Sequence, residues 1–194
     1  MGARLTPDFF DRPVEIVSRE LLGCALFLKG AGGTIVETEA YGPNDPACHA
    51  FRGKTERNAP LYGPPGSVYV YRSYGIHLLL NLVAEPEGRP AAVLIRALEP
   101  HAGLKRIRER RRGRSALDLC SGPGKVGQAL QIDLAMNGRV FDEAGLVIEH
   151  PESPVDDSLI LSGPRIGISQ AQDVPWRFHL AGSGYVSRPR LASE

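Results

Sequence analysis

The residues best suited to chemistry lie close together near the end of one expected strand. Alternate residues of a strand share a side, so Glu37 and Glu39 lie on the same side of the segment 34–41. Tyr41 ends this strand, and His49 lies in the polar loop that follows. A carboxylate, a phenol and an imidazole in one place suit general acid–base catalysis. The alternative is that both glutamates face solvent at a sheet edge.

A second hairpin carries tyrosines that could complete such a site. Tyr69 and Tyr71 share one side of the expected strand 67–71, and Tyr74 falls at the tip of the turn. Asn81 lies on the returning apolar strand 76–83. An aromatic side chain at an exposed tip has little structural purpose, although Tyr74 could instead fold back onto the core.

An arginine interrupts the most apolar expected strand, 91–98. A buried Arg96 needs an anionic partner or a cleft, and Glu37 or Glu39 on a neighbouring strand could provide the charge. The alternative is a structural ion pair without a role in chemistry.

Hydrophobic periodicity and turn residues predict the elements that position these groups. Strands are expected at 24–28, 34–41, 67–71, 76–83, 91–98, 145–149, 165–169 and 176–180, and helices at 13–22, 100–112 and 126–130. The pattern indicates an α+β fold over residues 1–194, in one domain with short flexible termini. Its core is a curved, mostly antiparallel sheet with peripheral helices and a protruding hairpin that carries the tyrosines.

Composition limits the classes of protein. The 194 residues carry a net charge of only +1, with no apolar run long enough to span a membrane, and none of the three cysteines forms a C-x-x-C pair. We therefore expect a reduced, intracellular protein. Seven of the ten residues from 105 to 114 are basic, whereas the charged residues of 142–157 are acidic. The basic run is either a solvated helix end or a patch that faces phosphates.

Other common sites find little support in the sequence. Glu39, His49 and His77 could bind a metal ion, but they lie in no recognised metal motif. Gly122 and Lys125 precede a helix and could bind a phosphate, although the spacing is not that of a Walker A loop.

Four blocks together resemble a known family. Residues 35–41, 69–75, 94–100 and 119–125 read IVETEAY, YVYRSYG, LIRALEP and LCSGPGK. In order and spacing they resemble the signature blocks of the alkyladenine (3-methyladenine) DNA glycosylase family, and the resemblance extends from about residue 4 to residue 187. The acidic segment 142–157 matches least. The chain resembles a minimal catalytic core of the bacterial type.

The resemblance implies a role for each candidate residue. Glu39 corresponds to the general base that activates water, and Arg96 to the arginine beside it. The residues that contact the extruded base correspond to Tyr41, His49, Tyr71 and Asn81. Tyr74 corresponds to the side chain that inserts into the duplex. Phosphate contacts are further expected from Arg72, His77, Arg110, Arg111, Gly122 and Lys125.

The implied activity is that of a monofunctional glycosylase, which leaves an abasic site and uses no metal, cofactor or lysine Schiff base. Its partner is double-stranded DNA with damaged purines, and we expect a monomer in the cytoplasm or nucleoid that does not bind membranes. The substrate range could include 3-methyladenine, 7-methylguanine, hypoxanthine and ethenoadenine. A non-catalytic binder of damaged DNA and a free-nucleoside hydrolase are the alternatives.

Overall fold

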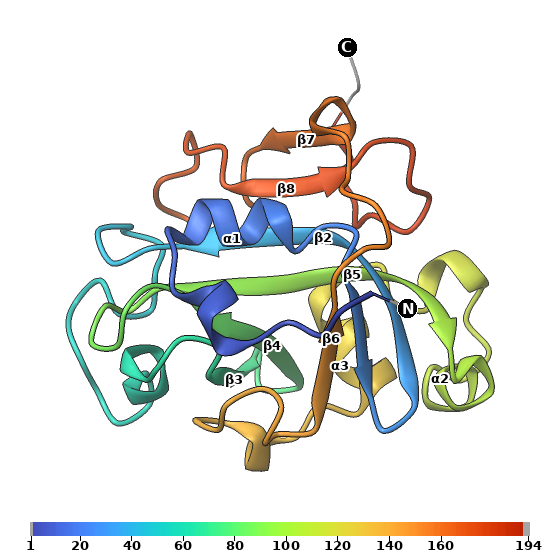
Figure 1. The fold of residues 1–194 in the computed structure, drawn as a ribbon, viewed down its shortest axis with the longest axis horizontal. Coiled ribbons are helices and arrows are strands. Elements are labelled where there is room, and N and C mark those ends of the chain that lie inside the picture. The colour runs from blue at the N-terminus through green and yellow to red at the C-terminus, as the bar shows by residue number, and fades with distance from the viewer. Residues whose placement is uncertain (1, 192–194) are drawn as a thin grey trace.

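The computed structural model describes residues 2–191, which form a curled antiparallel sheet with helices around it (Figure 1). The strand order is β3-β4-β5-β2-β1-β6, and β8 pairs with both β2 and β7. The strands are β1 (Ala25–Leu28), β2 (Ala31–Tyr41), β3 (Val68–Ser73), β4 (His77–Val83), β5 (Ala92–Ala102), β6 (Leu146–Glu149), β7 (Ile160–Gly163) and β8 (Arg177–Leu180). The α+β class and the mostly antiparallel sheet are therefore confirmed.

Three α-helices and five short 3-10 helices surround the sheet in the described residues. The α-helices are α1 (Val14–Glu20), α2 (Leu104–Arg110) and α3 (Pro123–Leu130). The 3-10 helices are η1 (Pro7–Phe10), η2 (Ala59–Tyr62), η3 (Ala116–Asp118), η4 (Leu134–Met136) and η5 (Asp157–Leu159). The expected flexible ends fall partly on residues 1 and 192–194, which lie outside the described residues.

The sheet is built around β2. On one side β2 pairs with β5, and on the other it pairs with β1 at residues 31–34 and with β8 at residues 37–39. The register between β2 and β5 shifts on either side of Glu37, and such bulges often re-aim side chains beside active sites. Glu37 and Glu39 are fully buried because side chains and backbone from other segments of the chain cover their carboxylates. The interpretation that these glutamates face solvent is wrong.

Two glycines allow β2 to begin at Ala31, earlier than expected. A Cβ atom on Gly32 would overlap the carbonyl oxygen of Leu26, and one on Gly33 would overlap that of Glu99. Only glycine fits where the neighbouring strands approach this closely. Gly32 and Gly33 therefore belong to β2 and not to the turn between the strands expected at 24–28 and 34–41.

One expected helix is shorter than predicted, and one expected strand is wrong. Helix α2 begins at Leu104, because β5 continues to Ala102 and its Pro100 pairs with Gly33. Residues 165–169 form a bent segment, and the strand in this region is β7, which was not expected. Arg165 explains the bend, since its side chain reaches back to the carbonyl oxygen of Ala40 at 2.8 Å.

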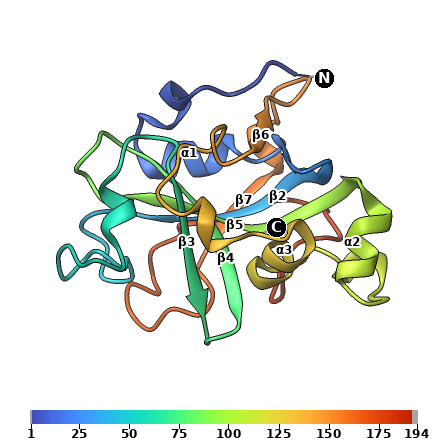
Figure 2. The ribbon, with the colours of Figure 1, turned by 90° about the horizontal axis from the view of Figure 1, so that it is seen from below.

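The two faces of β2 have different environments. On one face α1 packs against the strand, and Ser18 donates a hydrogen bond to Thr38 at 3.0 Å. The other face carries Glu37 and Glu39, which both contact Arg96 of β5. The β3–β4 hairpin projects from the body of the protein (Figure 2). None of the described helices is long and apolar enough to cross a membrane.

Candidate active site

A cavity of about 580 Å³ opens between the β3–β4 hairpin, β5 and the loops after β2 and β7. Its size falls in the range of pockets that bind small ligands. The cavity is lined by six of the site residues predicted from the sequence: Tyr41, His49, Tyr71, Tyr74, Asn81 and Arg96. Tertiary folding therefore brings these predicted residues into one place.

Glu39 lies directly beneath this cavity rather than in its wall. Its Oε2 atom accepts hydrogen bonds from the Tyr41 hydroxyl at 2.8 Å and from Arg96 Nη1 at 3.0 Å. Its Oε1 atom accepts a bond from the backbone N–H of Ile166 at 2.7 Å. Tyr41, Arg96 and Ile166 all line the cavity. A carboxylate has about four acceptor positions, so these three bonds fix Glu39 and leave room for one more donor.

Arg96 joins the two glutamates of β2. Its Nε donates to Glu37 Oε1 at 3.1 Å, while its Nη1 contacts Glu39. Burial lowers the pKa of Arg96, but the two carboxylates outweigh burial and raise it. The prediction that Glu37 or Glu39 neutralises Arg96 is confirmed for both residues, and Arg96 is a permanent cation beside Glu39.

Aromatic rings form the walls of the cavity. Tyr69 and Tyr71 stack with ring centroids 5.5 Å apart, and His49 meets Tyr71 edge-on at 4.5 Å. Burial raises the pKa of Tyr71 to about 12, with a further contribution from Glu39. Burial and Glu39 also raise the pKa of Tyr41 well above its usual value. Both phenols are therefore protonated at neutral pH.

Hydrogen bonds orient the polar groups of the walls. His49 Nδ1 lies 2.9 Å from the hydroxyl of Tyr69, and burial with the charge of Arg57 lowers the pKa of His49. The imidazole is therefore neutral at physiological pH. Asn81 donates from its side-chain nitrogen to the carbonyl oxygen of Tyr69 at 3.0 Å, so its side-chain oxygen is the atom left to contact a ligand.

Tyr74 stands at the tip of the hairpin with 87% of its surface exposed. Its backbone adopts a left-handed conformation with φ 48°, which is unusual for a residue with a side chain. The interpretation that Tyr74 folds back onto the core is wrong. Ile76 beside it is 70% exposed, so the tip presents an apolar wedge next to the mouth of the cavity.

The sequence profile of the methylpurine-DNA glycosylase family matches residues 8–184, a span that contains all the site residues described above. The chain belongs to the methylpurine-DNA glycosylase family. It is thus a DNA glycosylase, an enzyme that hydrolyses N-glycosidic bonds in DNA.

Bacterial relatives support this assignment. A protein of Rhodopseudomonas palustris strain CGA009 is 51% identical over 97% of this chain and 90% of its own length. A protein of Nitrosospira multiformis is 51% identical over 94% of this chain and 92% of its own length. Both carry names that assign them provisionally as 3-methyladenine DNA glycosylases.

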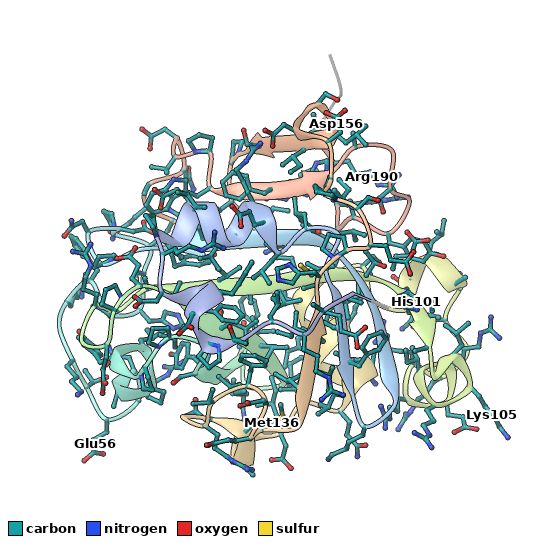
Figure 3. All side chains as sticks on the ribbon, in the orientation of Figure 1. Glu56, His101, Lys105, Met136, Asp156 and Arg190 are labelled. Atoms are coloured by element: carbon teal, nitrogen blue, oxygen red, sulfur yellow. The ribbon has the colours of Figure 1, made fainter. Side chains whose placement is uncertain are left out.

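Some basic side chains of residues 105–114 are partly buried, and the others are exposed. Arg110 donates to the carbonyl oxygen of Ala129 at 2.8 Å, and Arg111 donates to that of Leu119 at 3.0 Å. Both side chains thereby tie α2 to the α3 region. The basic side chains of this run that are exposed are Lys105, Arg106, Arg108, Arg112 and Arg114, and Figure 3 shows Lys105 at the outer edge of α2.

The other expected phosphate contacts lie around the hairpin and the start of α3. Arg72 is exposed and reaches the carbonyl oxygen of Gly75 at 3.5 Å. The ring of His77 packs so closely on Gly124 that a Cβ atom there would overlap it. Lys125 contacts Asp118 and Ser121. At Gly122 the backbone has φ 150°. Phosphate contact by these residues stays a prediction.

The sequence interpretation missed several residues that hold the site together. Asp45 and Arg165 form a buried ion pair, and the Arg165 guanidinium lies 4.7 Å from the centroid of the Tyr41 ring. Arg177 and Ser187 bind Glu37 from the C-terminal part of the chain. Arg177 carries the same signal as Arg96, a lone arginine in an apolar strand. Ser187 has no such signal.

Proposed function

We propose that this protein removes alkylated or deaminated purines from duplex DNA by flipping the damaged nucleotide into the cavity and hydrolysing its N-glycosidic bond. The observation that carries the proposal is the position of Glu39, fixed by three hydrogen bonds beneath an aromatic cavity whose mouth lies beside the exposed Tyr74.

In the proposed reaction, the bond between C1′ of the deoxyribose and N9 of the purine breaks, and its electron pair leaves with the base. The oxygen of a water molecule forms the new bond to C1′, and Glu39 takes the proton of that water. Positive charge develops on the sugar as the base departs, and the nearby carboxylate stabilises it. The product is an abasic site.

Arg96 and Ile166 support this role by fixing the carboxylate. They donate hydrogen bonds of 3.0 Å and 2.7 Å to different oxygens of Glu39, so the carboxylate cannot rotate freely. Preorganised groups avoid the cost of reorganisation during the reaction. The remaining acceptor position on Glu39 is the one that the attacking water would use.

The aromatic walls favour damaged bases over normal ones. Alkylation at N3 or N7 places a positive charge on the purine, and a cation over a tyrosine face gains about 0.5–2 kcal/mol. Tyr41 and Tyr71 line the same cavity and would hold such a ring between them. A damaged base also costs less to unstack from the duplex, which adds to selectivity.

Tyr74 would fill the gap that the flipped nucleotide leaves. Apolar side chains that wedge between base steps are a common device of proteins that open or kink DNA. The exposure of Tyr74 and Ile76 at the projecting tip fits this use, since neither side chain contributes to the core.

Glu39→Gln tests the proposal. Gel assays on duplexes that each carry 3-methyladenine, 7-methylguanine, hypoxanthine or ethenoadenine, followed by alkaline cleavage, would measure excision and rank the substrates. We expect the variant to bind an abasic-site analogue as the wild type does and to lose excision. Glu99→Gln is the matched control, because Glu99 is an exposed glutamate on β5. Unchanged excision by Glu39→Gln would contradict the mechanism.

The same assay separates the alternatives. A non-catalytic binder would show no cleavage with the wild type. A nucleoside hydrolase would release bases from free nucleosides and would be indifferent to Tyr74→Ala.

We further infer that the chain acts as one catalytic unit and as a monomer, in the cell compartment that holds the DNA. Support comes from the site itself, since β2, β3, β4 and β5 of one chain supply its residues. Analytical ultracentrifugation with and without a lesion duplex would measure the stoichiometry.

A further inference from the structure

A buried cluster of charged groups lies behind the proposed catalytic pair, and Glu37 is at its centre. Glu37 Oε1 accepts hydrogen bonds from Arg177 Nε at 2.7 Å, Arg96 Nε at 3.1 Å and Ser187 Oγ at 2.8 Å. Its Oε2 accepts the backbone N–H of Ser187 at 2.7 Å. Glu37 is 0% exposed, so it cannot reach the cavity or a substrate.

The cluster determines the orientation of Arg96. Three of its nitrogens are engaged: Nε with Glu37, Nη1 with Glu39, and Nη2 with Ser187 Oγ at 3.3 Å. A guanidinium group is a rigid plane, so fixing Nε and Nη2 also fixes where Nη1 points. The contact between Arg96 and Glu39 therefore depends on Glu37 and Ser187, although neither touches the cavity.

The charges of the cluster balance. Arg96 and Arg177 carry two positive charges, and Glu37 and Glu39 carry two negative charges, all on side chains that are at most 6% exposed. Burial alone would raise the pKa of Glu37, but Arg96, Arg177 and the bonds from Ser187 outweigh burial and lower it. Glu37 is therefore ionised at neutral pH.

Stability gives a weak reason for such a cluster. Buried ion pairs are costly to desolvate, and well-packed apolar residues in their place are often as stable or more stable. A requirement for one defined position of Arg96 gives a stronger reason. The C-terminal segment takes part, because Ser187 lies 150 residues away from Glu37 in the chain.

We propose that Glu37 and Ser187 are positioning residues that hold Arg96 against Glu39 and set the charge around that carboxylate. This inference rests on the proposed function of Glu39. It assigns to Glu37, the other glutamate of β2, and to a serine beyond β8 a part in the reaction that neither could play by contact with DNA.

Two variants and one control test the proposal. Glu37→Gln removes the central charge, and Ser187→Ala removes the hydroxyl that joins Glu37 to Arg96. Ser18→Ala is the matched control, because Ser18 is also fully buried and bonded to β2, through Thr38 on the opposite face. For each variant we would measure single-turnover excision at saturating enzyme, affinity for an abasic-site analogue, and the free energy of unfolding.

An enzyme commonly loses about 10²-fold in rate when a catalytic group is displaced. We expect a loss of about that size for Glu37→Gln and a smaller one for Ser187→Ala. Affinity for the abasic analogue should stay within about threefold of the wild type. Ser18→Ala should lose stability like Ser187→Ala and keep its rate.

The split between rate and affinity separates positioning from a merely structural role. The groups that bond to Glu39, which are Tyr41, Arg96 and Ile166, all persist in Glu37→Gln and Ser187→Ala. We therefore expect the single-turnover rate of the folded variants to fall while their affinity for the abasic-site analogue stays near that of the wild type. Ser18→Ala should leave both the rate and the affinity unchanged.

Several results would overturn the inference. A wild-type rate in a folded Glu37→Gln protein would do so, as would equal rate losses in Ser187→Ala and Ser18→Ala. If Glu37→Gln fails to fold, the comparison of excision rates between Ser187→Ala and Ser18→Ala still tests the positioning role. The wild-type arm tests the proposed function separately: an inactive wild type overturns both proposals, whereas an active wild type with unaffected variants overturns the positioning role alone.

Discussion

The hydroxyl of Tyr41 lies 2.8 Å from Oε2 of Glu39, so the aromatic wall of the cavity is bonded to the proposed base beneath it. The two residues are two positions apart on β2, and the alternation of the strand places both side chains on one side. One side chain therefore contributes both a ring for the ligand and a proton donor for the carboxylate.

Tyr41→Phe separates these two contributions. The ring remains, but Glu39 loses one of its three hydrogen-bond donors. The rate at neutral pH should fall by about 10- to 100-fold, because a hydrogen bond to a charged group is worth about 1.5–3 kcal/mol. Single-turnover assays at saturating enzyme would measure the rate, and the affinity for an abasic-site analogue should stay near that of the wild type. A wild-type rate in Tyr41→Phe would contradict the donor role.

Tyr74 is expected to matter for DNA and not for stability. Tyr74→Gly removes an exposed ring and relieves a left-handed backbone with φ 48°, so the free energy of unfolding should not fall. Excision from duplexes should decrease strongly. Urea denaturation and the lesion-duplex assay would measure the two effects. Leu159→Gly is a useful comparison, since Leu159 is also exposed, at 50%, but lies in η5 and does not line the cavity.

The ion pair between Asp45 and Arg165 should be important for folding. The two side chains are 2% and 0% exposed, and Arg165 Nη2 donates to Asp45 Oδ1 at 2.9 Å. Asp45→Asn leaves the arginine charge buried without its partner, which costs about 3–5 kcal/mol. Denaturant unfolding would measure this loss. Asp173→Asn, at an exposed aspartate, should stay within about 0.5 kcal/mol of the wild type; similar losses in both variants would disprove the special role of the pair.

The basic run should contact DNA through its exposed arginines. Arg112→Gln with Arg114→Gln should weaken binding to all sequences and reduce the slope of log affinity against log salt by about two, since each phosphate contact contributes about 0.9. The tip of the hairpin and the turn after α2 project on the same side in Figure 2.

Arg110→Gln with Arg111→Gln is the comparison for that experiment. These side chains bond to the carbonyl oxygens of Ala129 and Leu119, so their loss should mainly lower stability. Fluorescence anisotropy across salt concentrations would measure both pairs of substitutions. If the salt slope falls only for Arg110→Gln with Arg111→Gln, the exposed arginines do not contact DNA. The expectation from the sequence that Arg110 and Arg111 contact phosphates would then stand.

His179 should make stability depend on pH. It is 3% exposed, and the backbone N–H of Leu191 donates to its Nε2 at 3.3 Å, which requires a neutral ring. Burial lowers the pKa of His179 in the folded protein, and the charge of Arg177 adds to this effect. Below about pH 6.5 the unfolded chain therefore binds a proton that the folded protein does not.

Stability should then fall as the pH falls from about 6.5 toward the lower pKa of the folded state. Unfolding in urea at pH 7.5 and 5.5 would measure the loss. His179→Gln should show a smaller loss, and His150→Gln, at an exposed histidine, should keep the full one. An equal pH dependence in all three proteins would exclude His179 as the source.

Local pattern alone was enough for the main strands and for the grouping of Glu37, Glu39 and Tyr41. A strand repeats every two residues whatever surrounds it, so the residues that lie on the same side of a strand can be predicted without knowledge of tertiary contacts. The same reasoning placed Tyr74 at the tip of a hairpin, and a lone arginine in an apolar strand predicted a carboxylate partner for Arg96. The order of four sequence blocks was enough to indicate the family.

Tertiary structure decided which of those groups are buried and what holds them. Glu37 and Glu39 are buried because Arg96 of β5, Arg177 of β8 and the segments of Ile166 and Ser187 contact their carboxylates. These segments lie far apart in the chain. Arg165 and Ser187 reach the site from bends with no periodic pattern, and packing against α3 determines which arginines of the basic run remain exposed. Periodicity is a property of the local backbone, whereas burial and charge pairing arise only when distant segments pack together.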